Sequence, residues 1–103
     1  MKRPYTEKTL TENITIRGFS SNVNPSRLEW HRDKENRTIV VMEGSGWKFQ
    51  RDNSLPRKIE EGDVINIRAG EYHRLLKGEN DLIVTIIKEK KKADGSRSVK
   101  YKA

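Results

Sequence analysis

The sequence predicts a single small all-β domain, either a sandwich or a barrel. The chain has 103 residues, 32% hydrophobic and 36% charged, so it can hold one thin core and no second domain. Val and Ile supply 15 residues against 6 Leu and 3 Ala, and β-branched side chains fit a pleated sheet better than a helix. Short β-favouring runs recur with turn residues between them, which is the spacing of a sandwich or barrel.

The expected strands follow from these runs in chain order. They occupy residues 14–19, 28–31, 38–42, 47–50, 64–68, 73–76 and 82–88. The turns that separate them are rich in Ser, Asn, Gly and Asp, and they lie at 18–25, 44–46, 51–54 and 61–63. No long helical period and no internal repeat interrupts this pattern.

The two ends of the chain leave alternatives open. Residues 1–13 are polar, and they form either an arm that pairs with the sheet edge or a frayed terminus. Asp94-Gly95 favours a two-residue hairpin turn and residues 98–101 alternate, so the tail is either a final strand or disordered.

Cysteine usage and targeting signals narrow the class of protein. The chain has no cysteine, which excludes disulfides, zinc fingers and cysteine nucleophiles. The first fifteen residues lack the apolar stretch of a signal peptide, and no run approaches the roughly 20 apolar residues of a membrane span. We expect a soluble, cytoplasmic protein with no membrane partner.

The net charge of +7 is concentrated at the end of the chain. Residues 1–87 carry 15 Lys/Arg and 13 Asp/Glu, a net of +2, whereas residues 88–103 carry 7 and 2, a net of +5. The basic charge therefore belongs to the tail, where only Tyr101 could stack on a base. We expect nucleic acid not to be the partner of the folded part.

The two histidines of the chain predict a site. His31 and Asp33 are two residues apart, so on an extended strand their side chains point to one face. The segment 62–73 gives a turn, a buried strand, a second turn and His73, which could face them. Two imidazoles and one carboxylate would then form a set of three metal ligands.

At these residues the sequence resembles the cupin family of small β-barrels. The first cupin motif runs Gly, five residues, His-x-His, three or four residues, Glu, six residues, Gly. The matching positions here are Pro25, His31, Asp33, Arg37 and Gly44. Only the first His and the last Gly are kept, and an arginine in the Glu position cannot bind a metal.

The second cupin motif is better preserved. It runs Gly, five residues, Pro-x-Gly, two residues, His, three residues, Asn, and the matching positions here are Gly62, Arg68, Gly70, His73 and Lys77. The resemblance covers about residues 25–88 and implies a double-stranded β-helix, also called a jelly-roll barrel. It divides the chain into an N-terminal arm with the first strand (1–24), a barrel core (25–88) and a basic tail or final hairpin strand (89–103).

The resemblance also implies a cofactor and an assembly. Proteins of the family hold a divalent metal. The resemblance implies that His31 and His73 are metal ligands here, and that Asp33 is a ligand in place of the second histidine of the first motif. Two histidines and one carboxylate suit Fe(II), and also Mn, Ni or Zn. The family further implies a homodimer with a small-molecule pocket.

Each candidate residue also has a simpler structural interpretation. Asp33 could pair with Arg32 or Arg37 instead of a metal, and Glu35 is the reserve carboxylate, in a segment typical of a solvated turn. Arg37 and Arg68 either bind an anionic substrate or form ion pairs. Aromatic residues either shape the pocket or belong to the core, and those concerned are Trp30, Trp47, Phe49 and Tyr72.

The leading functional interpretation is a metal-dependent enzyme acting on a small polar or anionic molecule, of the oxygenase, hydroxylase or isomerase type. Arg37, Arg68, Trp47 and Phe49 would bind the substrate, and Tyr72 would supply a proton or a hydrogen bond. The alternative is a non-catalytic barrel that binds a sugar or another small molecule. A nucleic-acid module that uses its basic tail is the third possibility.

Overall fold

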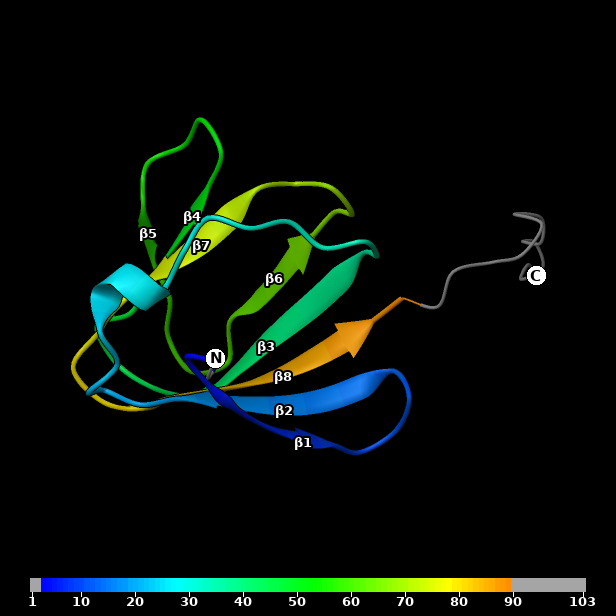
Figure 1. Ribbon diagram of the computed structural model, residues 1–103, viewed down its shortest axis with the longest axis horizontal. Coiled ribbons are helices and arrows are strands. Elements are labelled where there is room, and N and C mark those ends of the chain that lie inside the picture. The colour runs from blue at the N-terminus through cyan, green and yellow to red at the C-terminus, as the bar shows by residue number, and fades with distance from the viewer. Residues whose placement is uncertain (1–2, 90–103) are drawn as a thin grey trace.

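The computed structural model describes residues 3–89, and they form eight strands and one turn of 3-10 helix, η1 (Figure 1). The elements are β1 (Thr6–Thr9), β2 (Ile14–Phe19), η1 (Pro25–Arg27), β3 (Arg37–Glu43), β4 (Lys48–Arg51), β5 (Arg57–Lys58), β6 (Val64–Ile67), β7 (His73–Leu76) and β8 (Leu82–Lys88). The predicted all-β class is confirmed.

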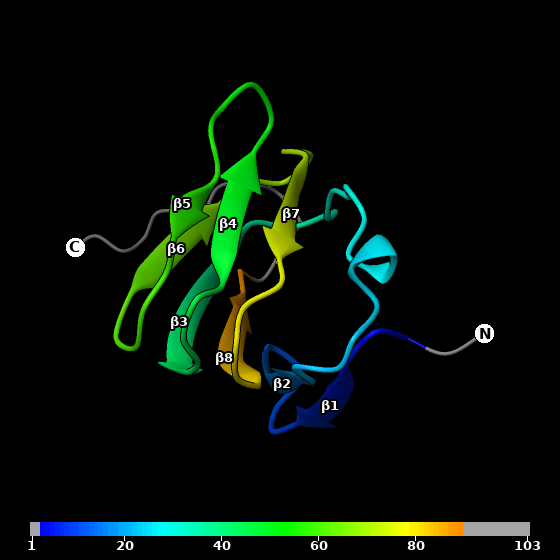
Figure 2. The same ribbon diagram turned by 90° about the vertical axis from the view of Figure 1, so that its left-hand side faces the viewer.

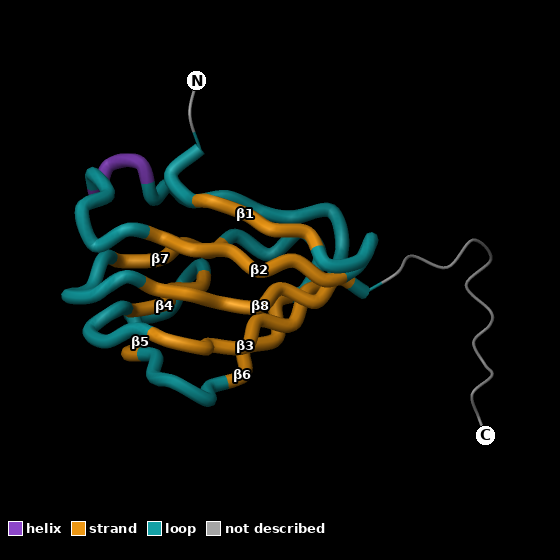
Figure 3. Tube along the Cα trace, turned by 90° about the horizontal axis from the view of Figure 1, so that it is seen from below, coloured by secondary structure: helices purple, strands orange, loops and turns teal. Residues whose placement is uncertain are grey.

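The strands form two sheets that face each other. The larger sheet has the order β1-β2-β8-β3-β6 and the smaller one has the order β5-β4-β7. Every pairing within them is antiparallel. Figures 2 and 3 show β4, β5 and β7 as a second layer over the five-stranded sheet. This is the arrangement of a small sandwich closed into a barrel.

The core lies between the two sheets and follows from alternation along the strands. In β8, Leu82, Val84 and Ile86 are buried while the residues between them are less so, which places one face of a β-branched strand inside. The buried hydrophobic residues are Phe19, Val41, Trp47, Phe49, Ile59, Ile67, Leu82, Val84 and Ile86.

The predicted strand at 28–31 is wrong. Asn24 caps η1 by accepting a hydrogen bond from the Ser26 backbone, and Pro25 supplies the fixed φ of a first helical position. The chain then crosses from the larger sheet towards β7 as an irregular segment, and only His31 makes a β-bridge (Figure 1). Local capping therefore overrides the β propensity of this run.

The N-terminal residues pair with the sheet edge. β1 pairs in full register with β2, from Thr6 opposite Gly18 to Thr9 opposite Thr15. β2 in turn pairs along its whole length with β8. The fold subdivision at residues 24 and 88 stays a prediction, and the predicted final strand lies in residues 90–103, outside the described part of the chain.

Candidate metal centre and its cavity

His31 and His73 are brought together by an isolated antiparallel bridge. The backbone nitrogen of each donates to the carbonyl of the other, at 3.0 and 2.9 Å. The bridge joins the irregular segment that crosses between the sheets to β7. It therefore brings together two histidines that are 42 positions apart in the sequence. The two imidazole rings pack edge to face, with centroids 4.3 Å apart.

Both imidazoles are oriented by the same local device. Nδ1 of His31 lies 3.1 Å from the Glu29 carbonyl, and Nδ1 of His73 lies 2.8 Å from the Glu71 carbonyl. A carbonyl oxygen only accepts, so Nδ1 carries the proton in each ring. Each Nε2 is then left with a lone pair, which is the state in which a histidine binds a metal.

Asp33 completes the group. One ligand atom from each of His31, Asp33 and His73 lies within 4.8 Å of the others. Asp33 Oδ2 is 3.4 Å from His73 Nε2, and this buried oxygen accepts no hydrogen bond. When His73 is neutral with its proton on Nδ1, the carboxylate oxygen and Nε2 are both acceptors and face each other without a donor between them; when His73 is protonated, the same contact is an ion pair. A cation at this point would satisfy all three groups.

The backbone of Asp33 is held by the turn at Gly70, the second glycine that matches the second cupin motif. Gly70 has a φ of +81°, which side chains rarely adopt, and its nitrogen donates to the Asp33 carbonyl at 2.8 Å. Asn36 Oδ1 accepts from the neighbouring Ala69 nitrogen at 2.7 Å. The turn before β7 therefore positions the carboxylate as well as His73.

Burial and nearby charges set the ionisation of the group. His31 lies at the cavity mouth and is exposed as a residue, but the desolvation of its ring lowers the pKa of the imidazole, outweighing the hydrogen bond to Glu29. Burial alone would raise the pKa of Asp33, but a hydrogen bond from His73 when that ring is protonated, and the charge of Arg37, lower it. The favoured state is a neutral His31 beside an ionised Asp33.

Arg37 occupies the position where the cupin motif has its glutamate. Its Nη1 is 3.4 Å from Asp33 Oδ1, and its Nε donates to Glu35 Oε2 at 2.7 Å. The ion pair that was the alternative to metal binding is therefore present. It uses only Oδ1 of the carboxylate, so Oδ2 remains directed at His73.

Tyr72 does not face the site. The residues on either side of the two histidines point to the opposite face of the bridge and stack in pairs, Trp30 under Arg74 at 4.7 Å and Tyr72 under Arg32 at 5.1 Å. Tyr72 is 41% exposed and lines neither cavity described below. The structure therefore does not bring Tyr72 to the histidines, and its catalytic role stays a prediction.

Trp47 is a core residue. Its side chain is fully buried, and Nε1 donates to the Asn80 carbonyl at 2.6 Å. A Cβ on Gly78 would lie 2.4 Å from the Trp47 backbone nitrogen, so the indole segment packs directly against a residue without a side chain. Trp47 lines neither cavity described below, and its role in substrate binding stays a prediction.

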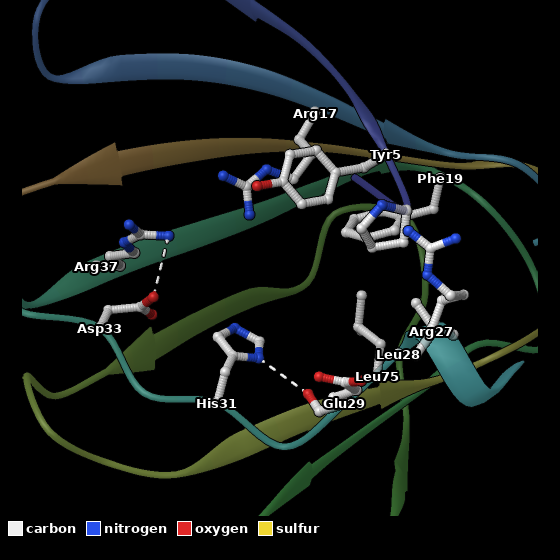
Figure 4. Close-up of a pocket in the computed structure, with 11 residues that line it drawn as sticks. Tyr5, Arg17, Phe19, Arg27, Leu28, Glu29, His31, Asp33, Arg37 and Leu75 are labelled. Atoms are coloured by element: carbon white, nitrogen blue, oxygen red, sulfur yellow. Dashed lines mark hydrogen bonds and ion pairs between the residues drawn. The ribbon is translucent and has the colours of Figure 1, made fainter. Parts of the chain in front are cut away.

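Two adjoining cavities lie beside the histidines. The inner one has a volume of about 60 Å³, and its walls include Phe49, whose ring is 5.7 Å from that of His73. The outer one has a volume of about 290 Å³ (Figure 4). The two cavities share six lining residues, which are Arg17, Phe19, His31, Asp33, Arg37 and Leu75.

Of the predicted substrate-binding residues, Phe49 and Arg37 line these cavities and Arg68 does not. Arg68 is exposed and lines another hollow, which reaches Arg37 but none of His31, Asp33 and His73. The structure therefore separates Arg68 from the histidines, although its backbone nitrogen donates to Glu71 at 3.1 Å.

Tyr5 and Arg17 are among the residues of the outer cavity that no motif of the sequence indicates. Tyr5 precedes β1 and packs edge to face on Phe19, with centroids 5.5 Å apart. Arg17 is on β2, and its guanidinium lies 3.9 Å from the Tyr5 ring centroid. Neither residue belongs to a motif, and only the pairing of β1 with β2 brings them to the cavity.

A scan of the chain against protein-family models finds no match. The chain is similar to an acireductone dioxygenase of Drosophila melanogaster, 43% identical over 58 residues, which are 53% of this chain and 30% of that protein. The chain thus spans less than a third of that relative's length.

Solved structures are similar over more of the chain. One is an RmlC-like cupin with a double-stranded β-helix fold from Methanocaldococcus jannaschii, with a TM-score of 0.64 and 11% identity over 84% of this chain and 81% of that one. Another is an Fe(II) form of HppE, with a TM-score of 0.61 and 12% identity over 74% of this chain and 41% of that one. In the described residues no helix is long and apolar enough to cross a membrane. With two facing antiparallel sheets and these neighbours, the chain has the cupin fold.

Proposed function

We propose that His31, Asp33 and His73 hold a divalent metal ion and that the chain acts on a small molecule in the adjoining cavities. The observation that carries this proposal is the unpartnered Asp33 Oδ2, buried and facing His73 Nε2 at 3.4 Å. Buried polar atoms without a partner are rare in folded proteins and call for an ion, a water or a function. The donor set fits Fe(II), Mn, Ni or Zn.

The residues of this chain have separate tasks in the proposed site. The two histidines and Asp33 bind the ion, and the Glu29 and Glu71 carbonyls keep each Nε2 directed inward. Glu71 is itself fixed by Arg51, whose Nη1 donates to both carboxylate oxygens at 2.9 Å. Arg37 keeps Asp33 ionised. A bound ion would supply Lewis-acid or redox chemistry with positions left open for a substrate.

The similarities support a metal-dependent reaction of the oxygenase, hydroxylase or isomerase type. The Drosophila relative is named a dioxygenase and the HppE structure holds Fe(II). Under this proposal the small molecule is polar or anionic. A homodimer and a cytoplasmic location are further predictions, and so is the alternative of a binding barrel without turnover.

A thermal-shift titration with Fe(II), Mn, Ni and Zn tests the proposal. An ion that binds only the native state raises the free energy of unfolding by about 2.7 kcal/mol at one hundred times its Kd. For a domain of this size we expect a rise in Tm of roughly 10–20 °C. The rise should persist in Glu43→Gln, an exposed carboxylate away from the site, and vanish in His31→Ala. Equal shifts in His31→Ala and the wild type would place the ion elsewhere.

Acidification should weaken metal binding. Protons compete for the same Nε2 lone pairs, and the lowered pKa of His31 keeps that ring neutral to a lower pH than the ordinary value of about 6.5. Asp33, with its lowered pKa, stays ionised across this range. We expect an affinity nearly constant from pH 8 to about 6.5, followed by a fall of about tenfold or more per pH unit. Calorimetric titration at several pH values measures it, and a constant affinity down to about pH 5 would contradict a histidine site.

A further inference from the structure

Three arginines line the outer cavity. They are Arg17, Arg27 and Arg37, and two acidic residues, Glu29 and Asp33, line it with them. Glu7 and Glu35 pair with Arg17 and Arg37 from outside the lining, so the cavity offers guanidinium donors and not a net positive charge. Guanidinium N–H groups that face the cavity without an acceptor would bind a small anion.

Arg17 is held in place with donors to spare. Its side chain is 14% exposed, its guanidinium stacks on Tyr5 at 3.9 Å, and both Nε and Nη2 donate to Glu7 Oε2. Within residues 3–89, Nη1 has no hydrogen-bond acceptor. A stacked and clamped guanidinium loses little further freedom when it binds a ligand.

Arg37 faces the same space from β3. Its Nε and Nη1 are engaged with Glu35 and Asp33, and in the described part of the chain Nη2 has no acceptor. Figure 4 shows Arg17 and Arg37 on the same side of the cavity, above Asp33 and His31. Each guanidinium thus keeps one terminal nitrogen without an acceptor while its other donors are engaged. A carboxylate matches this planar donor geometry.

The inner cavity determines which chemical group the other end of the ligand can have. Beyond the two arginines and the group His31, Asp33 and His73, its walls are apolar side chains, which include Ile39, Phe49, Ile59, Ile65, Ile67, Val84 and Ile86. Its volume of about 60 Å³ suits a few carbon atoms and no large ring. Polar groups placed there would lose their hydrogen bonds to water.

We propose that the site binds a short-chain monocarboxylate, and that Arg17 is the residue that determines this specificity. The carboxylate lies between Arg17 and Arg37, and the alkyl end enters the inner cavity next to His31, Asp33 and His73. A single carboxylate matches the two donors, Arg17 Nη1 and Arg37 Nη2, that have no acceptor within residues 3–89. The inference deepens the proposed function, because it names the substrate class of the same site, but anion binding itself requires no metal.

Butyrate is the probe, titrated into chelator-treated and metal-loaded protein and followed by NMR shifts. We expect butyrate to bind at least tenfold more tightly than butyramide, which has the same shape without the charge, and more tightly than inorganic phosphate. Arg17→Met should lose about 10- to 100-fold in butyrate affinity in the chelator-treated protein. Arg17→Lys should lose less, and Arg57→Met, an exposed arginine of β5, should bind as the wild type does.

Several results would overturn the inference. They are no butyrate binding by the wild type, equal binding of butyrate and butyramide, tighter binding of phosphate, or unchanged affinity in Arg17→Met. If Arg17→Met does not fold, Arg17→Lys decides, and wild-type affinity for both butyrate and butyramide in that variant counts against it. Butyrate binding by the chelator-treated wild type, in which no ion is bound, separates this inference from the metal proposal.

Discussion

The Asp33→Ala variant is expected to lose its affinity for divalent ions by at least about 100-fold while remaining folded. It removes one of three ligands, and even outer residues that merely orient a metal ligand cost about 10- to 100-fold. Arg37 keeps Glu35 as a partner, so we expect the free energy of unfolding to fall by only about 1–2 kcal/mol. Calorimetric titration and a denaturant melt of the same sample measure the two effects.

Glu35→Ala is the matched control for that variant. Sequence reasoning predicts it to be nearly silent, but Glu35 Oε2 accepts from Arg37 Nε at 2.7 Å, so a loss of about 0.5–1 kcal/mol in unfolding free energy is expected. Metal binding should persist. Full metal occupancy in Asp33→Ala would exclude Asp33 as a ligand, and complete unfolding of that variant would identify it as the structural partner of Arg37.

The Trp47→Ala variant is expected to lose about 3–5 kcal/mol of unfolding free energy. The indole is fully buried and its Nε1 is bonded to the Asn80 carbonyl, so the change opens a cavity and leaves an acceptor unpaired. A domain of this size has only about 5–15 kcal/mol in all. The variant should therefore melt far below the wild type in a urea titration.

Trp30→Ala is the comparison for Trp47→Ala. Trp30 is 40% exposed and contacts Arg74 on the outer surface, so its loss should cost about 1 kcal/mol or less. Equal urea midpoints for the wild type and Trp47→Ala would contradict the assignment of Trp47 to the core, and would restore it as a candidate ligand contact.

The strands were predictable where composition and turns agree. The ranges 14–19, 73–76 and 82–88 coincide with β2, β7 and β8, because each run is β-favouring and flanked by turn residues. The run at 28–31 failed because hydrogen bonds of the Asn24 side chain and the ring of Pro25 select a helical turn just before it.

The site was predictable only as far as motif spacing reaches. Spacing placed His31, Asp33 and His73 together, as the structure does. It did not distinguish Trp47, which points into the core, from Tyr72, which points outward, since that depends on how each segment meets the other sheet. Arg17 carries no local signal, because its place beside the cavity follows from the pairing of β2 with β8 and from Tyr5 lying against it.

The central claim is that one ion binds between His31, Asp33 and His73. An anomalous difference map from a crystal of the protein loaded with one equivalent of Mn or Zn tests this most directly. The account predicts one peak, within about 2.0–2.3 Å of both Nε2 atoms and of Asp33 Oδ2. A map with no peak there, or with its peak at other residues, would contradict it.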